Sequence, residues 1–131
     1  MTRPLGGVHS EFGVVLGTLV RAVPGARGAV LVDAEGLTID FANDTEVLDE
    51  LDLQIAGAQM AIPLLQAAKF ALGRGLGAST VLVEGPGGCV VGAIIDDDDA
   101  TLLLVLSQRA NLGTALRRFG EAHKGLLALL R

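Results

Sequence analysis

The sequence predicts one α/β domain of the layered α+β type, built from helices and antiparallel strands. Three observations lead to this fold class. Apolar residues recur at helical spacing in three segments, near each end and in the centre of the chain. Short apolar runs between them have the length of strands, and the turns that join these runs are too short for parallel crossovers. A chain of 131 residues can bury a core without disulfides or metals, so we expect residues 1–131 to be a single domain with a flexible segment over residues 1–8.

The first half of the chain predicts a helix followed by a strand hairpin. The helix is expected over residues 10–22 and ends at Pro24-Gly25. Its apolar stripe consists of Phe12, Val15, Leu16, Leu19 and Val23. Residues 29–33 and 37–41 predict two strands, joined by a turn in which Gly36 takes a positive φ.

A long central helix follows the hairpin and is apolar on two opposite sides. Asn43, with Glu46 three residues later, resembles a capping box that opens this helix, and the glycine-rich residues 73–77 end it. From Leu53 to Ala68 the helix has no charged side chain. One side consists of Leu51, Ile55, Ala58, Ile62, Leu65 and Leu72, and the other of Leu53, Ala56, Met60, Leu64, Ala67 and Ala71, with Gln59 and Gln66 along one boundary.

A helix that is apolar on two sides is buried on both. In a chain this small, the second side is expected to contact another molecule, which predicts a binding protein. Pro63 lies inside the helix and is expected to kink it, so the two sides need not stay aligned beyond that point.

The second half predicts three strands and a last helix. The strands are expected at residues 80–84, 89–95 and 101–106, and the short turns between them favour antiparallel pairing. The third strand is apolar throughout, which predicts a central position covered on both faces. A helix is expected from about Asn111, with an apolar side formed by Leu112, Ala115, Leu116, Phe119, Leu126, Leu127 and Leu130.

The composition argues against several classes of function. A net charge of −5 and the absence of Trp and Tyr disfavour nucleic-acid binding. The uncharged run of the central helix is shorter than the ~20 residues of a membrane-spanning helix, and no apolar core follows Arg3, so neither membrane insertion nor a secretory signal is expected. The lone Cys89 lies in an apolar run, which indicates a buried thiol in a reducing compartment and therefore a cytoplasmic location.

The sequence has no recognisable catalytic or ligand-binding motif. The glycines of residues 73–77 follow a helix, whereas a dinucleotide-binding loop follows a strand, and no phosphate-binding Gly-x-x-x-x-Gly-Lys motif occurs. Residues 96–99 are all Asp and lack the spacing of a calcium loop, so we expect a solvated turn. His9 is expected on the surface and His123 beside the apolar side of the last helix, with no nucleophile next to either. We therefore expect no enzyme activity, no cofactor and no metal.

The order of elements resembles that of the roadblock (dynein light chain) family over nearly the whole chain. Two segments carry the resemblance. The segment VPGARGAVLVDAEGL at residues 23–37 is similar to the family's first hairpin, and LLLVLSQRANLG at residues 102–113 is similar to its last strand and the start of its last helix. Gly57 and Pro63 depart from the regular long helix of the family.

The resemblance implies a five-stranded antiparallel sheet with the long helix on one face and the N- and C-terminal helices on the other. It also implies a dimer in which long helices pack together and edge strands join two sheets. Roadblock proteins are adaptors, and several bacterial and archaeal ones bind small Ras-like GTPases.

These implications lead to a hypothesis for the interface. We assign the bulkier side, with Leu51, Ile55, Ile62 and Leu65, to the protein's own sheet, and the side with small residues to the dimer partner; the reverse assignment is the alternative. The expected interface residues are Leu53, Ala56, Gln59, Met60, Leu64, Gln66, Ala67 and Ala71 of the helix and Thr80, Leu82 and Glu84 of a candidate edge strand.

The leading hypothesis is a non-enzymatic adaptor that forms a dimer with itself or a paralogue and binds or regulates a small Ras-like GTPase. One alternative is a scaffold subunit of a larger complex without GTPase contact. The other is a small-molecule sensor or enzyme that uses an internal cavity.

Overall fold

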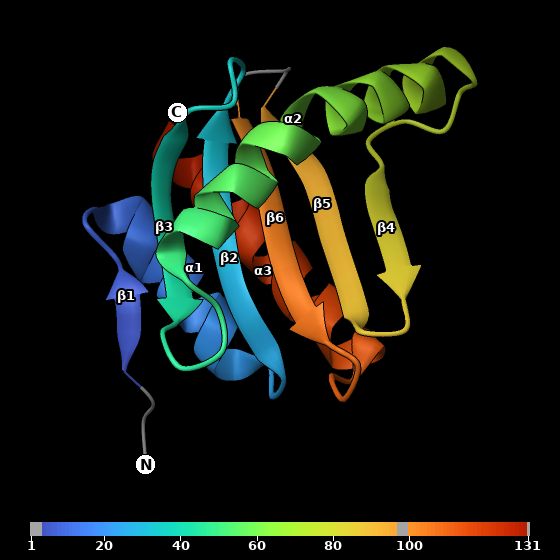
Figure 1. The fold of residues 1–131 in the computed structure, drawn as a ribbon. Helices are drawn as coiled ribbons and strands as arrows, with labels where there is room; N and C mark the ends of the chain where they lie inside the picture. The colour runs from blue at the N-terminus through green and yellow to red at the C-terminus, as the bar shows by residue number, and fades with distance from the viewer. Residues whose placement is uncertain (1–3, 97–99, 131) are drawn as a thin grey trace.

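A computed structural model describes residues 4–96 and 100–130, which form three helices and one six-stranded sheet (Figure 1). In chain order the elements are β1 (Leu5–Gly7), α1 (Glu11–Ala22), β2 (Ala26–Asp33), β3 (Thr38–Asp44), α2 (Glu50–Gly73), β4 (Thr80–Gly85), β5 (Gly88–Asp96), β6 (Ala100–Ser107) and α3 (Leu112–Leu130). The strand order is β1-β3-β2-β6-β5-β4, and neighbouring strands are antiparallel. Residues 97–99 of the predicted aspartate turn lie outside the described residues.

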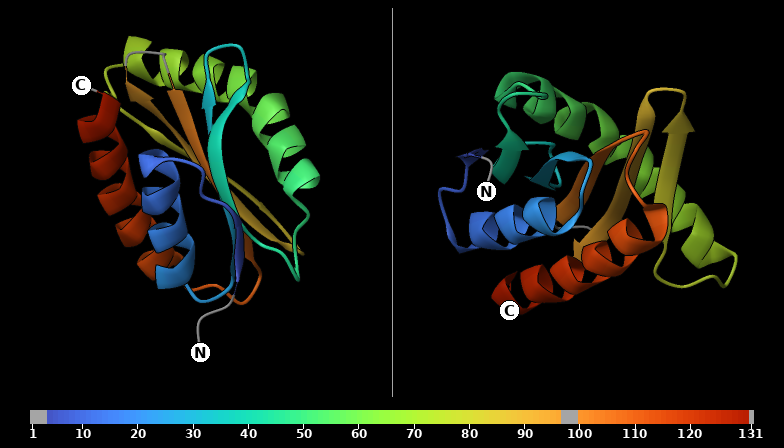
Figure 2. Two further views of the ribbon diagram at one scale, coloured as in Figure 1. Left: turned by 90° about the vertical axis from the view of Figure 1, so that its left-hand side faces the viewer. Right: turned by 90° about the horizontal axis from the view of Figure 1, so that it is seen from below.

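The sheet separates two helical layers. α2 lies on one face, and α1 and α3 lie next to each other on the opposite face (Figure 2). This confirms the predicted fold class and the arrangement of the layers. β6 lies between β2 and β5, and its residues 100–104 are buried, as its continuous apolar run predicts. The larger apolar cluster lies between the sheet, α1 and α3, and a smaller one lies beneath α2.

The sheet has six strands instead of the expected five because β1 adds a strand beside β3. Residues Leu5–Gly7 pair with residues 42–44 of β3, so the expectation of a flexible segment over residues 1–8 is wrong for this part of it. The chain then enters α1 through two residues with left-handed backbone, Gly7 (φ +82°) and Val8 (φ +62°). A run of Leu-Gly-Gly has too few side chains to show strand periodicity, which explains why it was not predicted.

A buried carboxylate on β3 holds the start of α1. Asp40 is 1% exposed. Its Oδ2 accepts hydrogen bonds from the Ser10 hydroxyl at 2.7 Å and the His9 N–H at 2.9 Å, and its Oδ1 accepts one from the Phe41 N–H at 2.7 Å. Burial raises the pKa of Asp40, but the hydrogen bonds from Ser10, Phe41 and His9 outweigh it, so the pKa lies below its usual value of 3.8. Asp40 is therefore a structural anion that joins β3 to α1.

The beginning of α2 differs from the prediction. The helix begins at Glu50, and its N-cap is Asp49, whose side chain accepts the N–H of Leu51. Residues 43 and 44 are the end of β3, where Asn43 pairs with both β1 and β2 and Asp44 pairs with β1. The predicted capping box formed by Asn43 and Glu46 is therefore wrong, because tertiary pairing extends the strand over Asn43.

The end of α2 is as predicted. Gly75 has a φ of +79°, and the N–H groups of Gly75 and Leu76 donate to the carbonyls of Leu72 and Ala71. This pair of bonds satisfies the last carbonyl groups of a helix and requires a residue that tolerates positive φ. The helix bends near its middle (Figure 2), where Pro63 lies in the sequence and removes one backbone hydrogen bond.

Candidate interaction surface

The inner side of α2 packs on the sheet through two leucines placed over glycines. Leu53 is fully buried and Leu64 is 2% exposed. A Cβ added at Gly28 of β2 would lie 3.0 Å from the Leu53 side chain, and one at Gly92 of β5 would lie 2.6 Å from that of Leu64. Between these contacts α2 passes close to β2 at Gly57. A Cβ added at Gly57 would lie 2.8 Å from a methyl group of Val32. The glycines allow α2 to lie close to the sheet.

The outer side of α2 carries large apolar side chains in solvent. Leu51 is 59% exposed, Ile55 44%, Ile62 60% and Leu72 67%. The helical period places the first three in one row along the helix. The assignment of this bulkier side to the protein's own sheet is therefore wrong, because the side with Leu53 and Leu64 faces the sheet. Side-chain size does not predict which side of α2 faces the sheet, because Gly28 and Gly92 of the sheet leave space for Leu53 and Leu64 on the side that also carries the small residues.

The expected interface residues divide into three groups in the structure. Those on the inner side of α2 that are buried, where no partner can reach them, are Leu53, Leu64 and Ala71. Those that are half-buried are Ala56, Met60 and Ala67. Those that are exposed are Gln59, Gln66, Thr80, Leu82 and Glu84.

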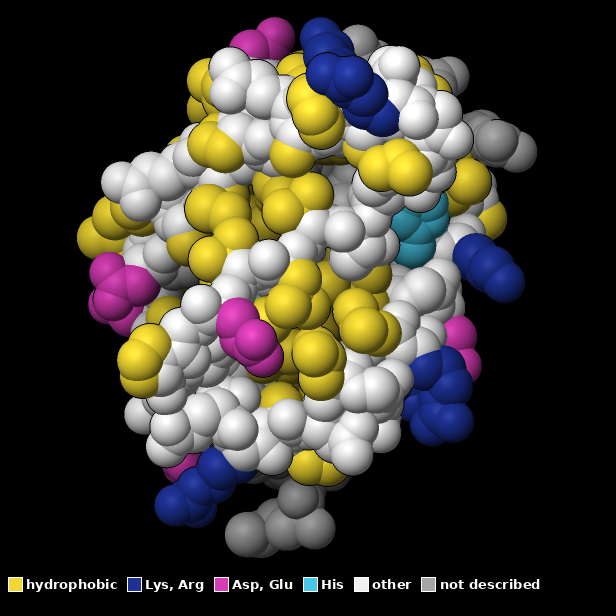
Figure 3. All heavy atoms as spheres, turned by 90° about the vertical axis from the view of Figure 1, so that its right-hand side faces the viewer, with side chains coloured by type: hydrophobic (Ala, Val, Ile, Leu, Met, Phe, Trp, Pro, Cys, Tyr) yellow, Lys and Arg dark blue, Asp and Glu magenta, His cyan; other side chains and the backbone are white. Residues whose placement is uncertain are grey.

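The strand β4 forms an open edge of the sheet. It pairs with β5 on one side and has no neighbour among the described strands on the other, which agrees with its prediction as an edge strand. Val83, on the α2 face of β4, is 51% exposed. Figure 3 shows hydrophobic side chains gathered on this side of the molecule, with few charged side chains among them. We name the combined feature the α2–β4 surface, defined by Leu51, Ile55, Ile62, Leu72 and Val83 together with the free backbone edge of β4.

Sequence reasoning missed three exposed apolar residues, two of them beside this surface and one within it. Phe70 is 64% and Leu76 70% exposed, and both lie near the end of α2, which extends past β5 toward and beyond the β4 edge (Figure 1). The guanidinium of Arg74 lies 4.9 Å from the centre of the Phe70 ring. Val83 was also missed, because the chosen alternation in β4 selected Thr80, Leu82 and Glu84. No local pattern indicates how far a helix extends past the last strand of a sheet.

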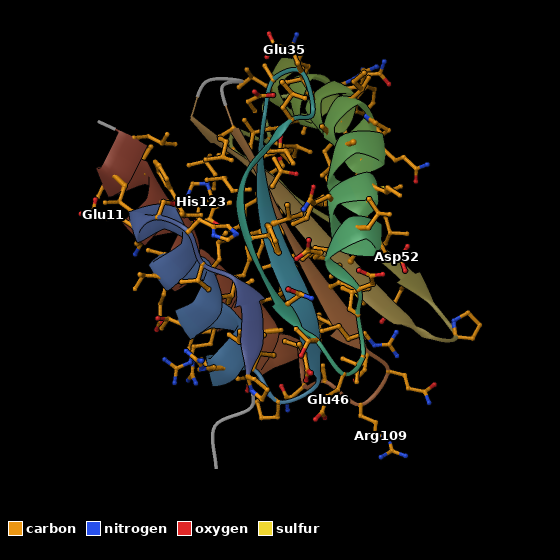
Figure 4. All side chains as sticks on the ribbon, turned by 60° about the vertical axis from the view of Figure 1, so that its left-hand side comes forward. Glu11, Glu35, Glu46, Asp52, Arg109 and His123 are labelled. Atoms are coloured by element: carbon orange, nitrogen blue, oxygen red, sulfur yellow. The ribbon has the colours of Figure 1, made fainter. Side chains whose placement is uncertain are left out.

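The ionisable side chains do not form a catalytic arrangement among the described residues. Figure 4 shows Glu35, Glu46 and Asp52 well apart on the side of the molecule that carries α2, and Arg109 points into solvent away from all three. No group of three or more His, Cys, Asp or Glu residues within the described parts of the chain could hold a metal ion.

The two histidines and the cysteine occupy structural positions. His9 is exposed and contacts the edge of the Phe41 ring. His123 is half-buried and points toward the sheet (Figure 4), with its Nε2 3.1 Å from the carbonyl oxygen of Ile94. Cys89 is half-buried, and burial followed by the charge of Glu84 raises the pKa of its thiol. A raised pKa keeps the thiol protonated and unreactive.

One described helix, α2, is long and apolar enough to cross a membrane by length and composition. Helices that pack in the core of a soluble protein meet the same criterion. The inner side of α2, with Leu53, Ala61 and Leu64, packs on the sheet in this way.

Three solved structures share this arrangement of helices and strands. A Roadblock/LC7 domain from Streptomyces avermitilis superposes with a TM-score of 0.73 at 19% identity, covering 89% of this chain and 95% of that one. MglB from Myxococcus xanthus gives 0.78 at 20% identity, covering 93% and 96%, and MglC from the same organism gives 0.66 at 26% identity, covering 91% and 98%.

This chain has the roadblock fold. The predicted resemblance is thereby confirmed at the level of structure. A scan of family models and a search of curated proteins give no match in sequence. In this roadblock fold, β1 is the addition to the expected five strands, and the α2–β4 surface is the main exposed apolar feature on the α2 side of the sheet.

Proposed function

We propose that this chain is a non-catalytic cytoplasmic adaptor that forms a dimer with a copy of itself or a paralogue, and that the dimer binds and regulates a small Ras-like GTPase. The α2–β4 surface is the observation that carries this proposal, because it combines a row of exposed apolar side chains with a free strand edge. Exposed apolar patches on soluble proteins are typical of interaction sites.

The α2–β4 surface suits a symmetric partner. Under a two-fold axis, β4 pairs antiparallel with β4 of a second copy, and the two α2 helices meet on the same face of the joined sheets. Between Leu53 and Ala68 α2 carries no charge, so two copies approach without repulsion there. Full burial of a Leu, Ile or Val side chain contributes about 1.5–3 kcal/mol, and several such side chains offset the cost of association.

The GTPase part of the proposal is supported by the fold together with the resemblance to roadblock proteins that bind small Ras-like GTPases. The chain lacks a phosphate-binding Gly-x-x-x-x-Gly-Lys motif, so in this proposal the nucleotide belongs to the partner. The adaptor acts by contact with the GTPase and supplies no nucleotide-binding loop of its own.

The dimer is tested by light scattering on size-separated wild-type protein and on Ile62→Asp. The substitution places a charge in the middle of the α2–β4 surface, and a monomer is expected. Val14→Asp is the matched control, because Val14 is 59% exposed on α1, on the opposite side of the sheet; this variant is expected to remain dimeric. A wild-type monomer at micromolar concentration contradicts the proposed dimer.

The GTPase contact is tested with the small Ras-like GTPases of the source organism, each loaded with GTP or GDP. Wild-type protein is expected to co-elute with the GTPase in one of its two nucleotide states and to change its rate of GTP hydrolysis. Ile62→Asp is expected to do neither. A dimer that has no effect on the GTPase favours the scaffold alternative.

A further inference from the structure

A groove lies on the opposite face of the sheet, between α3 and β4. At one end is an open pocket of about 500 Å³ lined by Thr80, Phe119, Lys124 and neighbouring residues of α3. At the other end is a smaller pocket of about 280 Å³ between Glu84 of β4 and Leu112 of α3. We name the strip that contains both pockets the α3–β4 groove. Thr80 and Glu84 of β4 and Leu116, Gly120 and His123 of α3 line the pockets, and Leu82 lies between Thr80 and Glu84 on the same face of β4.

The groove exists because the helical layer ends before the sheet does. Helices pack about 8–10 Å apart, whereas strands lie about 4.8 Å apart, so each helix covers about two strands. α1 contacts β3 and β2, and α3 contacts β5. On this face β4 is left with no helix above it, and Leu82 of β4 and Leu116 of α3 remain 37% and 40% exposed. The uncovered strip is one strand wide, about half the spacing of packed helices, so a helix placed beside α3 would contact β4 and extend past the sheet edge.

Gly120 leaves open space on the α3 side of the groove. A glycine in the middle of a helix costs about 1 kcal/mol relative to alanine. A Cβ added at Gly120 would meet no atom within 4 Å, so packing inside this chain does not require the glycine. Gly57 and Gly92, by contrast, are each required by a close contact with their own core. An absent side chain at Gly120 allows another backbone to approach α3 closely.

The rim of the groove carries unpaired positive charge. Arg117 and Lys124 are seven residues apart and therefore lie in line on the outer edge of α3. Within the described part of α3, Arg118 and Glu121 form an ion pair at 3.0 Å, whereas neither Arg117 nor Lys124 has an ion-pair partner among the described residues. In a chain with a net charge of −5, this basic rim favours acidic side chains on whatever fills the groove.

We propose that the α3–β4 groove binds an amphipathic helix of a partner protein, with apolar residues facing Leu82 and Leu116 and with Asp or Glu beside Arg117 and Lys124. The six residues of β4 span about 20 Å, which corresponds to about 13 residues of helix. The proposal rests on features of one protomer and stands independently of the dimer and the GTPase. Pairing of β4 with a second strand uses its backbone edge and leaves this face open.

The test is a selection from a displayed library of helix-forming peptides against the whole chain, followed by fluorescence-polarisation titration of the enriched peptides. We expect them to carry an apolar stripe flanked by Asp or Glu. Gly120→Leu adds a side chain whose Cβ meets no atom within 4 Å, so it is expected to preserve the unfolding midpoint, to occupy the groove and to weaken peptide binding at least tenfold. Ala128→Leu, also on an exposed position of α3 but outside the groove, is the matched control and is expected to bind as wild type.

Charge reversal provides a second readout. Lys124→Glu is expected to weaken the binding of the acidic peptides. It is expected to strengthen the binding of the same peptides when Lys replaces Glu. The proposal is overturned if no helical peptide is enriched, if enriched peptides bind Gly120→Leu as tightly as wild type, or if their affinity is unchanged by Lys124→Glu. Peptides that lose binding with Ile62→Asp but not with Gly120→Leu would place the site on the α2–β4 surface and also overturn it.

Discussion

The two edges of the sheet differ in how they end. At the edge next to β3, the three-residue strand β1 pairs with residues 42–44 and is itself the last strand of the sheet, although two of its residues are glycines. At the β4 edge no described strand covers the backbone, and the neighbouring α2 presents apolar side chains to solvent. An uncovered edge next to apolar side chains is a site of association. The sheet therefore ends in a short strand with one side chain, Leu5, packed on the core at one edge and in a longer strand beside exposed apolar side chains at the other.

The supports beneath the two edges also differ in chemistry. Near the β3 edge, the buried Asp40 collects hydrogen bonds from Ser10 and two backbone N–H groups. Near the β4 edge, Leu64 of α2 fills the space above Gly92. The β3 edge is therefore held by hydrogen bonds to Asp40, and the β4 edge by apolar packing of Leu64 on β5. The following substitutions test this difference, from the largest expected effect on folding or association to the smallest.

Truncation of Leu64 is expected to have the largest effect. Leu64→Ala removes a buried side chain that joins α2 to β5, and we expect a loss of about 3 kcal/mol in the free energy of unfolding. Leu76→Ala is the control, because Leu76 is 70% exposed, and a change below about 0.5 kcal/mol is expected. Urea unfolding followed by circular dichroism measures both. Equal losses for the two variants would show that α2 is not anchored at Leu64.

Removal of the Asp40 charge is expected to loosen the β3 edge. Asp40→Asn replaces one acceptor oxygen by an amide group that faces donors, and a loss of about 2 kcal/mol is expected at neutral pH. Because the folded pKa lies below the usual value, Asp40 contributes stability above the unfolded pKa, and this contribution is lost as the pH falls through the folded pKa.

The measurement is urea unfolding of wild type and Asp40→Asn from about pH 7 down to about pH 3. The difference between the two proteins is expected to shrink toward acid pH. Glu35→Gln, at an exposed position in the β2–β3 turn, is the control for a general charge effect. A difference that stays constant over this pH range contradicts the role given to the Asp40 carboxylate.

A charge on the open edge is expected to change association more than folding. Val83→Lys places an ammonium group at the exposed edge of β4, where a lysine opposes strand pairing. The free energy of unfolding of the monomer is expected to change by less than about 0.5 kcal/mol, while the dimer measured by light scattering is lost. Leu37→Lys, at a 65% exposed position far from β4, is the control. A Val83→Lys dimer of wild-type affinity would separate β4 from the interface.

The smallest effect is expected at the turn after β1. Val8 has a φ of +62°, a backbone conformation that is unfavourable for a β-branched residue and tolerated by Asn. Val8→Asn is therefore expected to raise the free energy of unfolding by about 0.5 kcal/mol. Val47→Asn, at another exposed valine, is expected to bring no gain. Lower stability in Val8→Asn would show that the side-chain contacts of Val8 outweigh its backbone strain.

Much of the fold follows from local sequence because its elements obey local rules. The stripe of α1 with its cap at Ser10, the turn at Gly36 and the glycine-rich end of α2 are all predicted by nearby residues. The start of α2 is not predicted by nearby residues. Asn43 satisfies a helix-capping pattern, but it pairs as part of β3 with residues that are distant in sequence. Long-range pairing overrides the local preference at this position.

The candidate site is predicted in kind but not in detail. Two apolar sides on α2 predict that its own sheet does not bury both, and one side is indeed exposed in the structure, although a helical wheel does not say which side meets the sheet. That choice depends on Gly28 and Gly92, which lie on different strands and become neighbours of Leu53 and Leu64 through the fold alone. The α3–β4 groove is likewise set by how many strands the helices cover, which no single segment encodes.

The bend in α2 at the turn containing Pro63 has a consequence for partner choice. A straight helix presents one continuous plane, whereas a bent one presents two short planes at an angle. A partner with a straight helix can follow only one of them, so it forfeits the contacts of Leu51 and Ile55 or those of Leu72. A copy of this chain, or a paralogue with a proline at the matching turn, can follow both. In the proposed dimer, the position of Pro63 therefore favours a partner whose own α2 bends at the matching turn.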